Sequence, residues 1–441
     1  MLRFKTLCLA AIAFSSTLPI PTFAAGQEKV LYNFARGKLK GIWPEGGVIL
    51  DAAGNLYGTA NQGGNMETCS GYGCGTVFEL SPGAGGTWTE TVLHKFTGPD
   101  GAFPDSRLTF DAAGNLYGTS WTGGNYDEHC GGGWGCGTVF ELSPGPDGKW
   151  TEKALYTFCP SGGHCLDGFS PEGGVVLDAE GNLYGTVEEG AGHFRGAVFE
   201  LSPGPNGTWA ETLLYSFGDG AYPASGVIFD NAGNLYGEAT YGGGSGCGPD
   251  SGGCGAIFEL SPSPRGGKWQ ETILYNFNDA NGANGAFPGG GLIFDASGNL
   301  YGTTYGGGAH NDGTVFQLSP GANGTWTETV LRRFYDDRSP NGVILDAAGN
   351  LFGTSGVGGP GCDFEYDWGC GTIFKLAPGP GGTWAYAELF VFRERDGYAP
   401  SGVVMDAAGN LYGTTVFGGA YLSACLGGGI KGCGTVFEFT P

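Results

Sequence analysis

Short runs of apolar residues recur along the whole chain, and Gly, Pro, Asn or Asp stands at the ends of each run. Within residues 44–96 the runs follow the order "GGVILD", "NLYGT", "GTVFEL" and "WTETVLHKF". Runs of β-branched and aromatic residues between turn formers are typical of β-strands. No segment shows the i, i+3, i+4, i+7 spacing of an amphipathic helix over a useful length. The pattern predicts an all-β protein with four strands per unit.

The four-strand unit is repeated. The letters "DAAGNLYGT" begin at Asp51 and again at Asp111. Near-copies begin at Asp178, Asp230, Asp295, Asp346 and Asp406, so successive units are 51 to 67 residues apart. Four strands in units of this length are typical of β-propeller blades.

The two ends of the chain predict how the ring closes. "EKVLYNF" (Glu28–Phe34) reads as a fourth strand with no unit before it, and "GTVFEFTP" (Gly434–Pro441) reads as a third strand with no fourth after it. The first strand can therefore complete the last blade, and closure removes the free sheet edges that promote aggregation. We expect one domain over residues 26–441, a seven-bladed β-propeller with four antiparallel strands per blade.

The repeated pattern "GVIFDAAGNLYGTT…GTVFELSP…ETVLYSF" resembles the Gloeo/Verruco (GloVer) tandem repeat of exported bacterial proteins, seven times over nearly the whole mature chain. The resemblance implies an exported protein and supplies no activity. The chain differs from many members in its cysteine pairs and in lacking an anchor.

Two connections hardly vary between units, and we interpret both as structural turns. "DAAGN" joins the first and second strands, where Asp and Asn can bond backbone N–H groups and Gly can adopt a positive φ. It holds one carboxylate, whereas an EF-hand-like calcium loop needs several. "SPGPDGKW" (Ser143–Trp150) joins the third and fourth strands and is similar in length to a sialidase-type Asp-box, but Gly145 stands where that motif has Asp. The tryptophans that start the fourth strands are expected to pack between blades.

Residues 1–25, "MLRFKTLCLAAIAFSSTLPIPTFAA", read as a secretory signal peptide cleaved near Ala24 or Ala25. Arg3 and Lys5 precede an apolar stretch that Ser, Thr and Pro interrupt, so a membrane span is disfavoured. We expect a secreted or periplasmic protein without a membrane-inserted segment after cleavage.

Twelve cysteines beyond Cys8 support this location. They form six close pairs: Cys69/Cys74, Cys130/Cys136, Cys159/Cys165, Cys247/Cys254, Cys362/Cys370 and Cys425/Cys433. In an exported chain an even set predicts disulfides, and zinc-type spacings are absent.

The formal charge of the chain is −23. Such acidity disfavours nucleic acid and anionic lipid as partners, because affinity for phosphates comes mainly from Lys and Arg. We expect a monomer without a cofactor.

The second–third and fourth–first connections vary between units and, by strand alternation, share one face of the propeller. Variable loops on a rigid scaffold are where binding sites are built. Five cysteine pairs lie in second–third loops and Cys159/Cys165 lies in a fourth–first loop. Four of the five histidines also lie in these loops, and His94 lies in a strand.

Three functions compete. The first is a binding module for an extracellular glycan or envelope polymer, in which loop aromatics stack on the ligand; its candidates are Trp121, Tyr126, Trp134, Tyr241, Tyr305, Tyr366 and Trp368. The second is a hydrolase or lyase with its site at the axial mouth, with or without a divalent cation; its candidates are Glu188, Glu189, His193, His310 and Asp312. The third is a structural envelope protein. Binding is the leading hypothesis, because a lone loop histidine is more often solvated than catalytic.

Overall fold

The computed structural model describes residues 26–36, 40–130, 133–160, 165–191, 195–218, 221–244, 247, 252–263, 268–278, 284–308, 310–335, 338–359, 369–423, 425–427 and 430–441. The predicted signal peptide, residues 1–25, lies outside these ranges.

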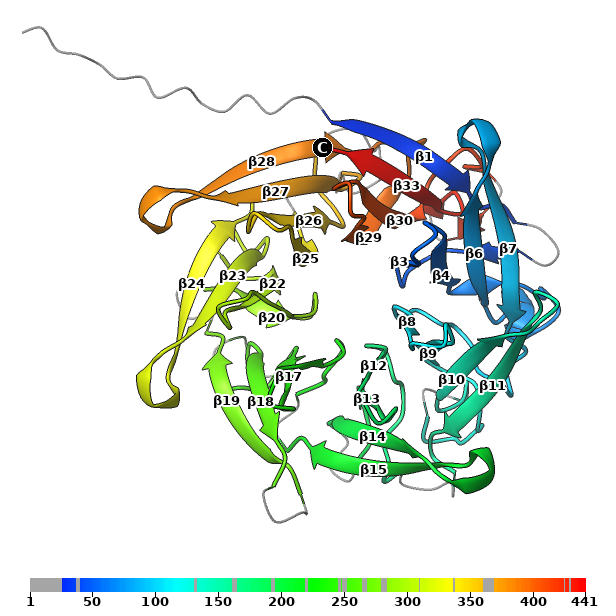
Figure 1. Ribbon diagram of the computed structural model, residues 1–441, viewed down its shortest axis with the longest axis horizontal. Coiled ribbons are helices and arrows are strands. Elements are labelled where there is room, and N and C mark those ends of the chain that lie inside the picture. Colours follow the sequence, from blue (N-terminus) through cyan, green and yellow to red (C-terminus); the bar gives the residue numbers. More distant parts are fainter. Residues whose placement is uncertain are drawn as a thin grey trace, which may run out of the picture.

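Seven antiparallel sheets stand around a central axis, each with its first strand innermost (Figure 1). The first four blades are β3 (Val48–Leu50), β4 (Leu56–Ala60), β6 (Thr76–Pro82) and β7 (Trp88–Lys95); β8 (Thr109–Phe110), β9 (Leu116–Ser120), β10 (Thr138–Pro144) and β11 (Trp150–Thr157); β12 (Val175–Leu177), β13 (Leu183–Val187), β14 (Ala197–Pro203) and β15 (Trp209–Ser216); and β16 (Ile228–Phe229), β17 (Leu235–Ala239), β18 (Ala256–Ser261) and β19 (Gln270–Asn276).

The remaining three blades follow the same plan, except that the fifth has its inner strand divided in two. They are β20 (Ala286–Pro288) with β21 (Ile293–Phe294), β22 (Leu300–Gly306), β23 (Thr314–Pro320) and β24 (Trp326–Arg333); β25 (Pro340–Leu345), β26 (Leu351–Ser355), β27 (Thr372–Pro378) and β28 (Trp384–Val391); and β29 (Tyr398–Met405), β30 (Leu411–Phe417), β33 (Thr435–Thr440) and β1 (Gln27–Asn33). The seven-bladed prediction is confirmed.

The N-terminal strand closes the ring as predicted. β1 pairs antiparallel with β33, with Gln27 opposite Thr440 and Asn33 opposite Thr435. Two short pairs lie in the variable connections: β2 (Gly41–Ile42) with β5 (Gln62–Gly63), and β31 (Leu426–Gly427) with β32 (Ile430–Lys431). Single 3-10 turns complete the described elements, at η1 (Cys69–Gly71), η2 (Ala84–Gly86), η3 (Pro205–Gly207), η5 (Ala322–Gly324) and η6 (Pro380–Gly382). Among the described residues, no helix has the length and apolarity needed to cross a membrane.

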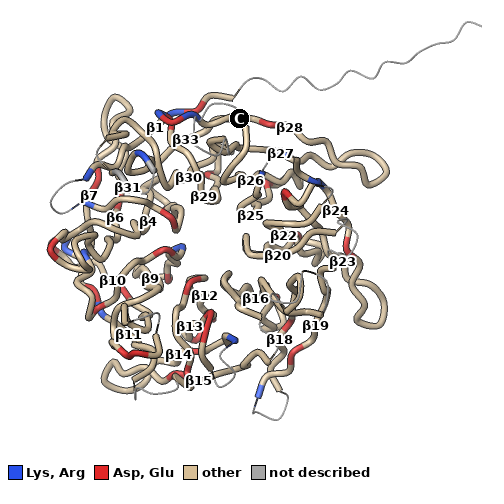
Figure 2. The backbone as a smooth tube through the Cα atoms, turned by 180° about the vertical axis from the view of Figure 1, so that it is seen from behind, with Lys and Arg blue, Asp and Glu red and all other residues tan. Residues whose placement is uncertain are grey.

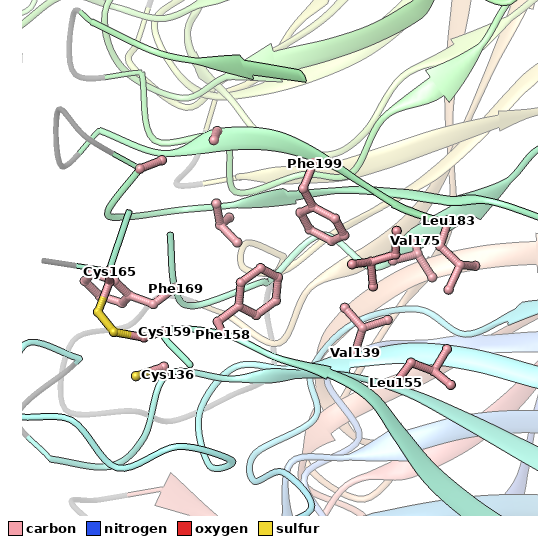
Figure 3. Close-up of a cluster of buried hydrophobic side chains, with 14 of the residues drawn as sticks. Cys136, Val139, Leu155, Phe158, Cys159, Cys165, Phe169, Val175, Leu183 and Phe199 are labelled. Atoms are coloured by element: carbon pink, nitrogen blue, oxygen red, sulfur yellow. A yellow bond between two sulfur atoms is a disulfide. The ribbon is translucent and has the colours of Figure 1, made fainter. Parts of the chain in front are cut away.

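Phenylalanine pairs hold each blade against the next. The Phe that follows a fourth strand packs against the third-strand Phe of the next blade, with ring centroids 5.0–5.3 Å apart. The seven pairs are Phe34–Phe78, Phe96–Phe140, Phe158–Phe199, Phe217–Phe258, Phe277–Phe316, Phe334–Phe374 and Phe392–Phe437. Figure 3 shows Phe158 and Phe199 in the core between the second and third blades. The repeated Phe thus supplies a hydrophobic contact at every junction.

The "DAAGN" turn is self-contained. Asp51 Oδ1 accepts hydrogen bonds from the N–H groups of Ala53 (2.8 Å) and Asn55 (2.9 Å), and its Oδ2 accepts one from Asn55 Nδ2 (2.8 Å) and one from Tyr57 Oη (3.2 Å). Gly54 has a φ of 86°, which a residue with a side chain rarely adopts. These bonds support the structural interpretation of the turn.

The tryptophans that start the fourth strands lie half-buried between blades, as predicted. Trp150 of the second blade, for example, lies 6.1 Å from the Tyr57 ring of the first blade, centroid to centroid.

Candidate functional site

The seven copies of the repeat can be compared with one another, and departures from the shared pattern gather around the axis. Six residues before the turn aspartate, the first three blades carry an acidic residue: Glu45, Asp105 and Glu172. The other four blades carry Ala224, Gly289, Pro340 and Pro400 at that position. Because equivalent positions in a propeller are related by rotation about the axis, the three acids form an arc on one side of it.

A cavity of about 500 Å³ lies on the axis, and all seven blades contribute to its wall. Glu45, Asp105 and Glu172 line it together with many small residues, among them Gly173, Ser225, Gly290, Asn341 and Ser401. Figure 2 shows acidic residues on the inner rim of the ring beside β4 and β12. The volume of the cavity lies in the range of small-molecule sites. One side of the cavity therefore carries three acidic residues together with Arg107, and the other side is neutral.

The carboxyl groups on the acidic side are held close to one another inside the ring. Burial raises the pKa of Glu45 from 4.5 to about 7. Burial, with the charges of Glu188 and Glu45, raises the pKa of Glu172 to about 7. Burial also raises the pKa of Asp105 well above 3.8, and the charges of Glu172, Glu45 and Glu188 add to the effect. These side chains line the cavity but are only partly exposed, because the blades enclose them.

Further departures from the repeat stand at the cavity or beside it. Arg107 occupies a position that is glycine in the other six blades, and its exposed side chain lines the cavity. It reaches toward the seventh blade, since a Cβ built on Gly402 would lie 3.3 Å from its Nη2. No ion pair of Arg107 is found within the described ranges.

Glu238 takes the place of the threonine in "LYGT". In four other blades this threonine bonds the next blade, as when Thr59 Oγ1 donates to Ser106 O (3.1 Å). Glu238 is 1% exposed and its Oε2 accepts a bond from Gly291 N (2.8 Å), while its Oε1 has no partner in the described part of the chain. Burial raises its pKa to about 7.

Tyr305 and Glu188 are two of the site candidates predicted from the sequence, and both are associated with the cavity. Both are the fifth residue after the leucine of "NLYGT" in their blades; Glu188 follows the end of β13, and Tyr305 lies in the last part of β22. Tyr305 lines the cavity, and its Oη donates to Gly289 O (3.4 Å). Burial, with the charges of Glu238 and Glu172, raises its pKa to about 12. Glu188 is half-buried, and its charge acts on both Asp105 and Glu172.

The other predicted site residues are spread over the loop face. Trp121, Tyr126, Trp134 and Tyr241 are 37–57% exposed. Tyr241 packs against Tyr222 (5.7 Å) and Phe287 (5.5 Å), and Trp134 packs against Phe103 (5.8 Å). These three contacts fit the role of anchoring loops. Among the described residues, no contact joins these four aromatics into one binding surface. The candidates His193, Tyr366 and Trp368 lie outside the described residues.

The predicted catalytic candidates are not brought together. Glu188 and Glu189 lie in the β13–β14 connection of the third blade, whereas His310 and Asp312 lie in the β22–β23 connection of the fifth. His310 is exposed and Asp312 is half-buried. Of this set, Glu188 is the residue that acts on the cavity carboxyls.

Five predicted disulfides are present: Cys69–Cys74, Cys130–Cys136, Cys159–Cys165, Cys247–Cys254 and Cys425–Cys433. Cys370 is also disulfide-bonded, and its predicted partner Cys362 lies outside the described residues. Disulfides of this number are typical of proteins outside the reducing cytoplasm.

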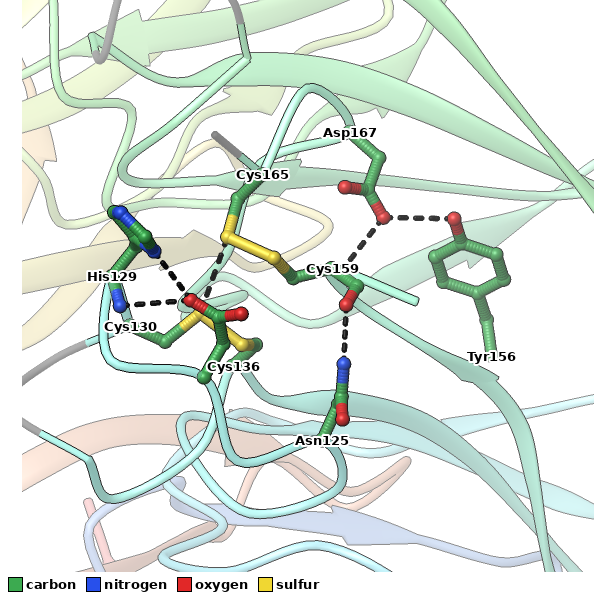
Figure 4. Close-up of a disulfide and its surroundings, with 9 residues drawn as sticks. Asn125, His129, Cys130, Cys136, Tyr156, Cys159, Cys165 and Asp167 are labelled. Atoms are coloured by element: carbon green, nitrogen blue, oxygen red, sulfur yellow. Dashed lines mark hydrogen bonds and ion pairs between the residues drawn. A yellow bond between two sulfur atoms is a disulfide. The ribbon is translucent and has the colours of Figure 1, made fainter. Parts of the chain in front are cut away.

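Two of the bridges touch at the junction of the second and third blades (Figure 4). Cys130 Sγ lies 3.4 Å from Cys165 Sγ. Asp167 Oδ2 accepts bonds from Cys159 N (2.9 Å) and Tyr156 Oη (2.8 Å), which fixes the loop between β11 and β12.

The comparisons with known proteins agree with this architecture. The chain is a seven-bladed β-propeller, a class to which structures with similar folds also belong. The model of the Gloeobacter/Verrucomicrobia repeat matches residues 248–441, so this part of the chain carries the repeat that the sequence pattern resembles. No curated protein matches the sequence significantly.

Two solved structures illustrate the likeness. A streptogramin B lyase structure is 13% identical with a TM-score of 0.54, over 94% of this chain and 97% of that one. PorZ, described as a bacterial surface component of the type-IX secretion system of Porphyromonas gingivalis, is 13% identical with a TM-score of 0.50, over 89% of this chain and 46% of that one. At such identity the likeness concerns the fold alone.

Proposed function

We propose that this propeller binds a small polyhydroxylated ligand, such as the end of a glycan chain or envelope polymer, in its axial cavity. The observation that carries the proposal is the arc of Glu45, Asp105 and Glu172 on one wall of a cavity of about 500 Å³. Asp105 Oδ1 is buried and has no hydrogen-bond partner among the described residues. Carboxyl groups left without partners in a cavity are expected to receive hydrogen bonds from a ligand, and sugar hydroxyls can donate them.

The neutral wall suits the same ligand. The glycines leave room, Ser and Asn offer further polar contacts, and Tyr305, a residue that is 41% exposed, lines the cavity as well. An aromatic ring can pack against the apolar face of a sugar while its neighbours bond the hydroxyls. The cavity thus combines the polar and apolar contacts that the glycan hypothesis requires.

The test is a thermal-shift screen of monosaccharides and oligosaccharides, followed by calorimetry. We expect a saccharide that raises the melting temperature of the wild-type protein and binds Asp105→Asn and Glu172→Gln at least tenfold more weakly. Glu67→Gln is the matched control, because Glu67 is an exposed carboxylate of the β5–β6 connection and does not line the cavity. If a saccharide binds and both cavity variants retain wild-type affinity, the binding site is elsewhere and the proposal fails.

A second candidate, catalysis of a hydrolysis or elimination in the same cavity, is favoured by one observation. The pKa values of Glu45 and Glu172 lie at about 7, so at neutral pH each carboxyl can either donate or accept a proton. Assays with simple esters and lactones distinguish this function from binding alone. We expect turnover that Glu172→Gln abolishes if the cavity is catalytic, and no turnover above background if it only binds.

We also propose that the protein acts after export, in the periplasm or outside the cell. The disulfides and the signal-like residues 1–25 support this location. Fractionation of the native cells, with N-terminal sequencing of the protein, tests it. An exported chain that begins after Ala24 or Ala25 is expected, whereas an uncleaved chain in the cytoplasm would contradict the proposal.

A further inference from the structure

The outer rim of the propeller carries polar clusters at most of its blade junctions. They are built around the second residue before the Phe that follows a fourth strand; at the junction of the sixth and seventh blades this residue is Phe390, which packs against Phe439 instead. Most often this residue is Tyr and its partner is Glu. Tyr215 Oη, for example, donates to Glu271 Oε2 (2.7 Å). At two junctions, therefore, a phenol donates to a carboxylate of the next blade, whereas Tyr156 donates to Asp167 of the loop that follows its own strand.

A residue from the following loop often joins the pair and completes its hydrogen bonding. Lys40 Nζ lies 2.9 Å from Glu90 Oε2 and donates to Tyr32 Oη (2.6 Å). At the junction of the fourth and fifth blades, Asn284 Nδ2 donates to Tyr275 Oη (2.7 Å), and the charge of Glu328 acts on Tyr275. In these two clusters the added residue is a cation or a neutral amide.

The junction of the first and second blades departs from this pattern. His94 replaces the tyrosine, Asp100 comes from the following loop, and Glu152 is the carboxylate of the next blade. One potential ligand atom from each of the three lies within 4.8 Å of the others. His94 Nε2 and Asp100 Oδ2 are 3.0 Å apart. Among the clusters described, this one alone consists of imidazole and carboxylate groups, which are common metal ligands.

The cluster is held in place by bonds that leave ligand atoms available. Thr97 donates to Asp100 Oδ1 from both its N–H (2.8 Å) and its Oγ1 (2.9 Å), so that Oδ2 faces His94. The His94 ring packs edge-on against Phe96, with centroids 4.8 Å apart. Glu152 Oε1 is buried and has no hydrogen-bond partner among the described residues. Asp100 and His94 are therefore oriented, and Glu152 has an unused acceptor.

We propose that His94, Asp100 and Glu152 form a site for a divalent transition-metal ion of the Zn²⁺ class that links the first two blades. Bonds of about 2.0–2.1 Å in a tetrahedron separate ligand atoms by about 3.3 Å. The distance from His94 Nε2 to Asp100 Oδ2 is 3.0 Å, and the ligand atom of Glu152 lies within 4.8 Å of both. The side chains of His94 and Asp100 are about one-fifth exposed (20% and 21%), which leaves room for water as the fourth ligand. Two carboxylates beside a neutral imidazole carry a charge that a divalent cation balances.

The simplest rival explanation is a protonated His94 that bridges the two carboxylates without metal. In that case the site needs no ion, and Zn²⁺ would have to displace a proton and an ion pair to enter. The two explanations differ in a direct observable, since only a metal site binds Zn²⁺ or Co²⁺ with one-to-one stoichiometry at neutral pH and gives a Co²⁺ absorption spectrum.

The experiment is a titration of chelator-treated full-length protein with Zn²⁺ at pH 7.5 by calorimetry, repeated with Co²⁺ and visible spectroscopy. The matched variant is His94→Tyr/Asp100→Asn, which rebuilds the Tyr–Asn–Glu cluster of Tyr275, Asn284 and Glu328. Because that cluster already occurs in the fold, the variant should melt near the wild-type temperature in chelator. A second variant, Glu152→Gln, keeps His94 and Asp100 and removes one ligand.

We expect the wild-type protein to bind one Zn²⁺ that both variants lose, with a melting temperature that rises with free Zn²⁺ only in the wild type. A Glu45→Gln/Glu172→Gln variant should keep this binding, because its substitutions lie in the axial cavity. Failure of the wild-type protein to bind either ion would overturn the proposal. So would equal binding by the wild type and Glu152→Gln, whether or not the double variant folds.

Discussion

The hydroxyl of Tyr32 donates a hydrogen bond of 2.6 Å to Oε2 of Glu90, and the two residues lie on opposite sides of the junction between the last and the first blade. Tyr32 belongs to β1, which completes the last blade, and Glu90 belongs to β7 of the first blade. The bond therefore repeats, at the point where the chain closes, the same contact that joins Tyr215 to Glu271 within the ring.

Removing this hydroxyl should weaken the closure. We expect Tyr32→Phe to lower the free energy of unfolding by about 1–2 kcal/mol, because Glu90 keeps Lys40 as a partner but loses one charged hydrogen bond. Urea unfolding followed by tryptophan fluorescence measures the change. Tyr72→Phe is the control, since Tyr72 is 53% exposed in a loop. Equal stability of the two variants would mean that the bond contributes nothing to closure.

The fold could be predicted from the sequence because the information is repeated. Each unit shows the same strands and the same turns, and the unpaired Glu28–Phe34 and Gly434–Pro441 segments indicate the closure that β1 and β33 form. Local patterns of this kind depend on near neighbours in the chain, so one sequence is enough to interpret them.

The site was harder to predict because its residues are far apart in the sequence. Nothing within its own unit distinguishes Glu45, Asp105 or Glu172. The three residues come together because they occupy the same position of the repeat, and in each of their blades this position faces the axial cavity. Alignment of the seven copies at the turn aspartate supplies the missing signal, because acids then stand out at a position that is otherwise neutral. The loop aromatics drew attention for their residue type, but among those described only Tyr305 lines the cavity.

The pH dependence of stability should have a maximum in the acidic range. Seven glutamates have pKa values raised by burial from 4.5 to about 7: Glu28, Glu45, Glu152, Glu172, Glu211, Glu238 and Glu328. A raised folded-state pKa means that the folded protein prefers the protonated form. The stability that each of these protonated glutamates contributes is fully present below about pH 4.5 and is lost as the pH rises through 7.

The turn aspartates act in the opposite sense. Although burial alone would raise the pKa of Asp51, its hydrogen bonds from Asn55, Ala53 and Tyr57 outweigh this and lower it below 3.8. Five equivalent turns behave alike, those of Asp111, Asp178, Asp230, Asp295 and Asp406. Their contribution is lost as the pH falls below about 4. We therefore expect the melting temperature to rise from pH 8 to pH 5 and to fall below pH 4; a maximum at pH 7–8 would contradict this.

Neutralising the axial carboxyls should stabilise the protein. Glu45→Gln and Glu172→Gln each remove a buried charge that lies near others of the same sign, so each should raise the free energy of unfolding at pH 8 by about 1–2 kcal/mol. The gain is smaller than the pKa shifts imply, because cavity water screens the charges. The gain should disappear at pH 4.5, where the wild-type carboxyls are already protonated.

The measurement is urea unfolding at the two pH values, with Glu67→Gln as an exposed control. A residue whose replacement strengthens the fold while weakening ligand binding is retained for function at a cost in stability. Loss of stability at pH 8 on both substitutions would instead mean that these carboxylates have stabilising partners within the protein, and it would remove the main support for a ligand site.

The contact between two disulfides should permit an alternative bridge. Cys130 Sγ and Cys165 Sγ are 3.4 Å apart although each belongs to a different disulfide. In a Cys136→Ser/Cys159→Ser variant these two sulfurs lose their partners, and we expect them to join during oxidative folding because small side-chain movements bring them to bonding distance. Peptide mapping without reduction detects the new cross-link between the second and third blades. In the control Cys69→Ser/Cys247→Ser, the leftover Cys74 and Cys254 lie in separate core clusters and should remain free thiols. Two free thiols in the test variant would show that the loops hold the sulfurs apart once their own bridges are gone.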